Sequence, residues 1–188
     1  TDDSVYEGNE TGVVAIDTVS GGSATEDGTQ SVTITITENE SSPTITLATS
    51  ASSIAENAGS SLTLTATSSV AADEDITVTI TTSGTGTEGT DYSTISDITI
   101  SAGDTTGTAS FTPTDDSVYE GNETGIVAID SVSGADASES GSQSVTITIT
   151  ENDSSPTITL TTSATSIAEN AGSSLTLTAT SSIAADED

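Results

Sequence analysis

The chain has 188 residues, 30 Asp and Glu side chains and no Lys, Arg or His, which gives a formal net charge of −30. Without basic side chains it cannot neutralise phosphate groups, which argues against nucleic-acid partners and against attraction to anionic lipid. Without Cys or His it lacks the usual ligands of zinc, haem and iron–sulfur sites, and the thiol and base of the familiar catalytic triads. The remaining donors are carboxylate, hydroxyl and carbonyl oxygens, which suit a hard cation such as Ca²⁺.

Apolar residues alternate with Thr along much of the chain, as in Val145-Thr146-Ile147-Thr148-Ile149. This period of two is typical of strands with one buried and one solvated face. We expect an all-β protein, because no segment has helical periodicity, and no membrane insertion, because no apolar run approaches about 18 residues. In chain order the expected strands lie near residues 43–48, 52–55, 60–68, 76–82, 94–101, 106–113, 123–132 and 143–150.

The sequence repeats itself with a shift of 113 residues. Residues 1–75 align without a gap to residues 114–188 and differ at 11 positions. The segment Glu38–Pro43, repeated as Glu151–Pro156, is the best linker because Pro cannot continue a strand ladder. We therefore divide the chain into the C-terminal part of a preceding repeat (1–40), one complete repeat (41–153) and the N-terminal part of a following repeat (154–188). The chain also begins without Met or a signal peptide, so we expect it to be a window of a longer tandem array.

Successive connections in an antiparallel sandwich alternate between its two ends, and this alternation predicts where the acidic residues gather. The loops at 71–75, 101–104 and 134–141 fall at one end, while those at 56–59, 84–92 and 114–122 and the exit at 151–153 fall at the other. Like charges packed this closely repel, and a divalent cation with six to eight oxygen ligands removes the conflict. The predicted metal ligands are therefore Glu56, Asp91, Asp115, Asp116, Glu120, Glu123, Glu151 and Asp153.

The complete repeat resembles a Calx-beta domain. The resemblance is carried by Ser53–Gly59, by Gly84-Thr85 with Gly89–Tyr92, by Gly103-Asp104, by Asp115-Asp116 with Glu120 and Glu123, and by Glu151–Asp153. It implies a seven-stranded immunoglobulin-like sandwich that binds several Ca²⁺ ions at one end, through the same eight residues. The sequence departs from the family pattern at Ser83, where an acid is usual, and at Asn152, which interrupts an acidic run.

These observations lead to one functional hypothesis. We expect tandem calcium-loaded sandwiches to form a long extracellular or cell-surface rod, such as an adhesin stalk or a filament shaft. The bound Ca²⁺ would stiffen the joints between neighbouring repeats, which are the expected partners. The absence of Cys leaves metal binding and packing as the sources of rigidity.

Two other classes of function stay open. The chain could be a subunit of a self-assembling extracellular fibre that pairs with other copies of itself through strand edges or flanks. It could also be an adhesion module that binds ice, glycan or another ligand through a Thr-rich face. Paired carboxylates can hydrolyse glycosides, but here they lie in a crowded loop end without Trp, so we expect no enzyme.

Overall fold

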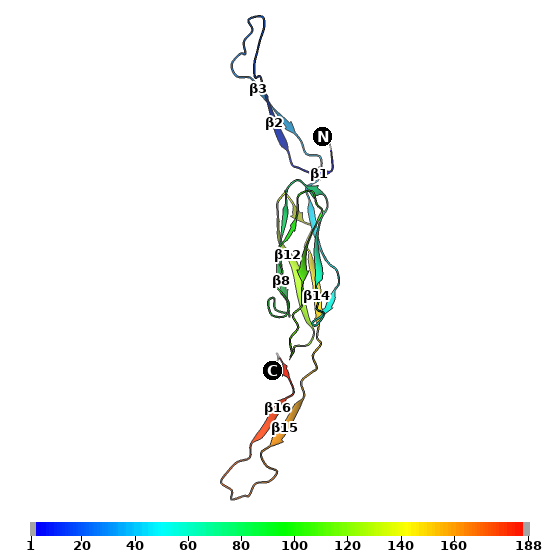
Figure 1. Cartoon of the computed structure of the whole chain (residues 1–188), viewed down its shortest axis with the longest axis vertical. Helices are drawn as coiled ribbons and strands as arrows, with labels where there is room; N and C mark the ends of the chain where they lie inside the picture. The colour runs from blue at the N-terminus through cyan, green and yellow to red at the C-terminus, as the bar shows by residue number, and fades with distance from the viewer. Residues whose placement is uncertain (1–2, 186–188) are drawn as a thin grey trace.

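The computed structural model describes residues 3–185, and within that range it contains strands and no helix. A β-sandwich occupies the middle of an elongated molecule, and one β-hairpin projects from each end (Figure 1). Among the described residues there is consequently no helix of the length and apolarity that a membrane crossing requires.

Two sheets form the sandwich. The first has the strand order β10-β6-β4-β13 and the second has the order β5-β14-β12-β8-β9. Neighbouring strands are antiparallel apart from two short parallel pairs, β4 with β13 and β5 with β14. The strands are β4 (Thr44–Thr49), β5 (Ser53–Ala55), β6 (Leu62–Ser68), β8 (Ile76–Gly84), β9 (Ile98–Ile100), β10 (Thr106–Phe111), β12 (Glu123–Ser133), β13 (Ser138–Glu139) and β14 (Ser144–Thr150).

The first strand of the repeat changes sheets part-way along, which explains the parallel pairs. β4 pairs with β6 in the first sheet, and β5 pairs with β14 in the second. Between them the chain stays hydrogen-bonded, since the Ser50 amide donates to the Thr63 carbonyl and the Ser52 carbonyl accepts from the Thr148 amide. The switch leads directly to Glu56, which therefore lies against the exit of β14.

The core between the sheets is aliphatic, with two aromatic rings at one end. Alternate residues of the facing strands are buried, as the period-two pattern predicts. Tyr92 and Phe111 stack with ring centroids 4.6 Å apart. A Cβ atom at Gly125 would lie 2.7 Å from the Phe111 ring, so only glycine leaves room for this pair. The aromatic pair closes the core beside the acidic end of the sandwich.

Most expected strands are confirmed to within a few residues, but the one expected at 94–101 is mostly wrong. Only Ile98–Ile100 forms a strand there. The Asp97 carboxylate accepts the Ile80 amide at 3.0 Å, and the Ile95 amide donates to Glu88, so side chains replace the expected backbone ladder. The stretch before Ile98 is consequently a loop.

The two terminal hairpins are incomplete copies of sandwich strands. β2 (Glu10–Ala15) and β3 (Ser31–Ile36) pair as β12 and β14 do, and β15 (Ile158–Thr162) and β16 (Leu177–Ser181) pair as β4 and β6 do. Their apolar faces are open. Ile34 is 52% exposed and Leu160 is 71% exposed, whereas their counterparts Ile147 and Leu47 are 0% and 7% exposed.

The hairpins meet the neighbouring repeat through short parallel strand pairs. β1 (Val5–Tyr6) pairs with β7 (Ala71–Ala72), and β11 (Val118–Tyr119) pairs with β17 (Ala184–Ala185). Each of these parallel pairs is called a joint, and the two joints have the same register, shifted by 113 residues. Each joint connects the acidic loop of one repeat to the opposite end of the next.

Candidate metal centre

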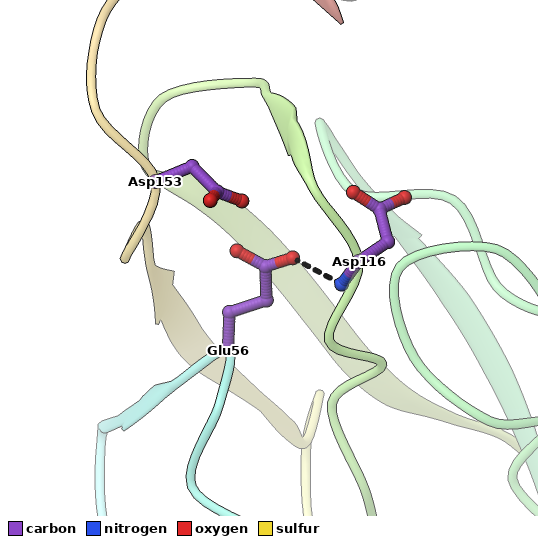
Figure 2. Close-up of side chains that lie close together, drawn as sticks. All are labelled: Glu56, Asp116 and Asp153. Atoms are coloured by element: carbon purple, nitrogen blue, oxygen red, sulfur yellow. Dashed lines mark hydrogen bonds between the residues drawn. The ribbon is translucent and has the colours of Figure 1, made fainter. Parts of the chain in front are cut away.

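The turn after β5, the loop before β11 and the segment after β14 bring acidic side chains together at one end of the sandwich. Carboxylate oxygens of Glu56, Asp116 and Asp153 all lie within 4.8 Å of one another. Glu56 and Asp153 direct their carboxylates into the same space, and the Asp116 backbone borders it (Figure 2). These three residues are called the first cluster.

The first cluster joins a buried carboxylate, Glu56, to a half-buried one, Asp153, and an exposed one, Asp116. Glu56 is 6% exposed, and its Oε1 accepts the Asp116 amide at 3.2 Å. Burial raises the pKa of Glu56, the Asp116 amide opposes this, and the Glu151 carboxylate adds to the increase. Burial also raises the pKa of Asp153, with further contributions from the carboxylates of Glu151, Asp115 and Asp116.

One oxygen in the first cluster has no partner. Asp153 Oδ2 is buried and accepts no hydrogen bond. A buried carboxylate oxygen normally finds a donor, because leaving it unsatisfied costs free energy. No amide or hydroxyl donates to this oxygen and the chain has no basic side chain, so a bound cation or water would satisfy it. The donor set, all carboxylate oxygens, fits a hard cation such as Ca²⁺.

A second cluster consists of Asp91, Glu120 and Glu123, whose carboxylate oxygens also lie within 4.8 Å of one another. Asp91 is 8% exposed, and its Oδ2 accepts the Thr87 amide at 2.6 Å. The same loop is fastened at a second point, because the Thr114 amide donates to the Asp91 carbonyl. The second cluster is thus held by the 84–92 loop and by the loop that leads into β12.

The two remaining predicted ligands lie outside both clusters. Asp115 accepts the Asn152 side-chain amide at 3.3 Å, next to the first cluster. Glu151 organises the loop: its Oε2 accepts the amides of Glu120 and Gly121, and its Oε1 accepts those of Asn152 and Asp153. Burial tends to raise the pKa of Glu151, but these four N–H donors outweigh burial and lower it. The role of all eight residues as ligands stays a prediction.

Glu38 confirms this loop-organising role in the preceding repeat. It is the counterpart of Glu151 and accepts the amides of Glu7, Gly8, Asn39 and Glu40 at 2.6–3.0 Å. These hydrogen bonds, with the Glu40 amide first, lower the pKa of Glu38 to about 2. The arrangement therefore belongs to the repeat and survives in a partial copy.

Glu88 is an acid of this end that the sequence analysis did not single out. Its Oε2 accepts the Thr82 hydroxyl at 2.6 Å and its Oε1 accepts the Ile95 amide at 2.7 Å. Both oxygens are thus used within the protein, which makes Glu88 a structural residue. Its position within the Gly-rich 84–92 loop was the one available signal.

Comparison with known proteins agrees with this architecture. The family model of the Calx-beta domain matches residues 38–153, more than half of the chain. The chain belongs to the Calx-beta family. Calx-beta domains are calcium-binding regulatory or structural modules rather than catalytic ones.

Solved Calx-beta structures are similar to this chain at low identity. The crystal structure of the apo-form Calx CBD1 domain is 17% identical, covers 60% of this chain and 99% of its own, and has a TM-score of 0.48. The crystal structure of CBD12 from CALX1.2 is 18% identical, covers 57% of this chain and 43% of its own, and has a TM-score of 0.46. No curated protein matches the sequence.

Proposed function

We propose that this chain is a calcium-binding structural segment of a long extracellular or cell-surface array, such as an adhesin stalk or filament shaft. The observation that carries the proposal is the unsatisfied, buried Asp153 Oδ2 beside two further carboxylates in a chain without cationic side chains. Calcium would supply the positive charge that the sequence lacks. Millimolar external calcium would fill even weak sites.

Six residues would hold the ions, and they form the two clusters described above. Glu56, Asp116 and Asp153 would bind in the first cluster, and Asp91, Glu120 and Glu123 in the second. Asp115 lies close enough to Asp153 to raise its pKa and could join the first cluster. Glu151 would support the site indirectly, because the four amide hydrogen bonds that it accepts hold the loops that carry Glu120 and Asp153.

The role of calcium as a stiffener of the joints follows from the position of β11. The acidic loop that supplies Asp116 and Glu120 also contains Val118–Tyr119, which pairs with β17 of the following repeat. An ion that orders this loop would also order the strand that touches the next repeat. Calcium would therefore convert a flexible chain of sandwiches into a stiffer rod.

Thermal unfolding of the full chain in calcium and in excess chelator tests the proposal. Calcium should raise the melting temperature of the wild type, and Asp116→Asn should remove most of that increase. Asp3→Asn is the matched control, because Asp3 occupies the same sequence position in the preceding partial repeat, where a counterpart of Glu56 is missing. An unchanged melting temperature on adding calcium would refute the proposal.

A further inference from the structure

At the joint between the preceding and the central repeat, Tyr6 of the preceding repeat inserts into the central repeat. Beyond the β1–β7 pairing, the Asp73 amide donates to the Tyr6 carbonyl at 3.1 Å. Tyr6 is only 9% exposed and belongs to the hydrophobic core of the central repeat. The Tyr6 hydroxyl donates to Asp136 Oδ2 at 3.0 Å, across 130 residues of sequence. Backbone, ring and hydroxyl thus all contact the neighbouring repeat.

The loop that supplies Asp136 is held in a costly conformation. Ala135 and Asp136 have φ angles of 51° and 49°, a region that non-glycine residues rarely adopt. Gly134 precedes them with φ of 95°, and a Cβ atom there would lie 2.2 Å from the Asp75 carbonyl oxygen. The central repeat therefore keeps alanine at position 135, where glycine would fit more easily.

The preceding repeat shows that easier alternative. It has Gly22 and Ser23 at the positions of Ala135 and Asp136, in the same left-handed conformation. This difference lies in the loop where the two copies diverge most. The backbone of the loop is therefore common to both repeats, and the charged acceptor is peculiar to the central one.

The second joint supplies a comparison within the same molecule. Val118–Tyr119 pairs with Ala184–Ala185 as Val5–Tyr6 pairs with Ala71–Ala72. The second joint has no counterpart of Asp136 among the 188 residues, and there Tyr119 is more exposed than Tyr6. The two joints therefore share the strand pairing, and the hydrogen bond to an acid of the following repeat is observed for Tyr6.

We propose that Ala71–Asp73 and Asp136 form a docking surface for the Val-Tyr segment of the preceding repeat, and that the residue at position 136 sets the strength of each joint. A repeat with Asp there accepts the tyrosine hydroxyl through a charge-assisted hydrogen bond. A repeat with Ser, as at Ser23, offers a weaker neutral partner. Joints along an array would therefore differ in strength according to one loop residue. This inference does not depend on calcium binding.

Amide hydrogen exchange of the full chain, followed by NMR, tests the docking surface. The Asp73 amide is a reporter of the joint, because its hydrogen bond to Tyr6 is broken only when the two repeats separate. Tyr6→Phe should speed its exchange about tenfold, as expected for the loss of a hydrogen bond to a charged group, and Asp136→Ser should speed it by a smaller factor because a neutral hydrogen bond remains. The double variant should exchange no faster than Tyr6→Phe alone, since Tyr6→Phe already removes the bond that Asp136→Ser weakens.

Controls should show that the effect is confined to this joint. Tyr119→Phe should leave the Asp73 amide unchanged, none of the variants should alter exchange of the Thr148 amide within the sandwich, and the pattern should hold in calcium and in chelator. Unchanged Asp73 exchange in Tyr6→Ala would overturn the docking surface. Additive effects of Tyr6→Phe and Asp136→Ser would overturn the assignment of joint strength to position 136.

Distance measurements give an independent readout of the same joint. The chain has no Cys, so spin labels on Thr33→Cys and Thr146→Cys, exposed and equivalent positions of the two repeats, would be the only labels present. The distance distribution should be narrow in this background and broaden in Tyr6→Ala. An equally broad distribution before and after that change would mean that the repeats do not dock.

Discussion

Replacing Glu56 by Gln should stabilise the protein in chelator and destabilise it in calcium. The substitution keeps the shape of the side chain and the oxygen that accepts the Asp116 amide, and it removes the buried charge. Carboxylate oxygens of Glu56 and Asp116 lie within 4.8 Å of each other, and at that distance two unit charges repel by about 3.5 kcal/mol at an effective dielectric constant of about 20. Exposure of the Asp116 side chain to solvent reduces this value, so we expect about 1–2 kcal/mol of stabilisation without metal.

Calcium should reverse the sign of the effect. A site at a hundred times its dissociation constant contributes about 2.7 kcal/mol, and Glu56→Gln should lose most of this contribution. Circular dichroism melts in the two buffers would report both effects, at about 4 °C per kcal/mol for a domain of this size. The sign reversal separates a metal ligand from a residue that merely packs.

Glu169→Gln is the matched control for this experiment. Glu169 lies in the same heptapeptide as Glu56, Ser-Ile-Ala-Glu-Asn-Ala-Gly, but it is exposed in the C-terminal partial repeat. It should leave the melting temperature unchanged in both buffers. If Glu56→Gln lowered stability equally in chelator and in calcium, the reasoning about an uncompensated buried charge would be refuted.

Three further predictions concern pH, loop structure and packing. In chelator, stability should rise as the pH falls from neutral toward 4.5, because the raised pKa values of Glu56 and Asp153 in the folded protein penalise their ionised forms. Stability should then decline toward pH 2, because Glu38, whose pKa is lowered in the folded protein, becomes protonated. Thermal melts across this pH range should therefore show a maximum. Glu88→Ala should cost about 1–3 kcal/mol in chemical denaturation, equally with and without calcium, because two hydrogen bonds to a carboxylate are lost. Gly125→Ala should cost about 1–3 kcal/mol in the same assay, because its new methyl group overlaps the Phe111 ring.

The fold was predictable because the signals that determine it are local and repeated. Alternation of apolar residues with Thr placed nearly every sandwich strand, and the 113-residue repeat related the strands of the terminal hairpins to those of the sandwich. The failure at 94–101 has a long-range cause. Asp97 accepts an amide from Ile80 on another strand, and no local pattern distinguishes such an acid from one in a solvated loop.

The location of the candidate site was predictable, but the separate roles of its acidic residues were less so. Alternating connections placed eight acids at one end, and the structure gathers six of them in two clusters. That Glu151 faces four backbone amides depends on how two loops fold around it, which composition and spacing do not encode. The Tyr6–Asp136 contact was not predictable from the sequence either, because it joins segments 130 residues apart.

The equal register of the two joints has a geometric consequence. Val5 pairs with Ala71 and Val118 pairs with Ala184; if every joint shared this geometry, one rotation with one translation would relate each repeat to the next. Repeating such an operation generates a helix, so the proposed array would have a defined pitch. A change of angle at one joint would then tilt every repeat beyond it. The resistance of such an array to force would be set by its weakest joint and not by the stability of any single sandwich.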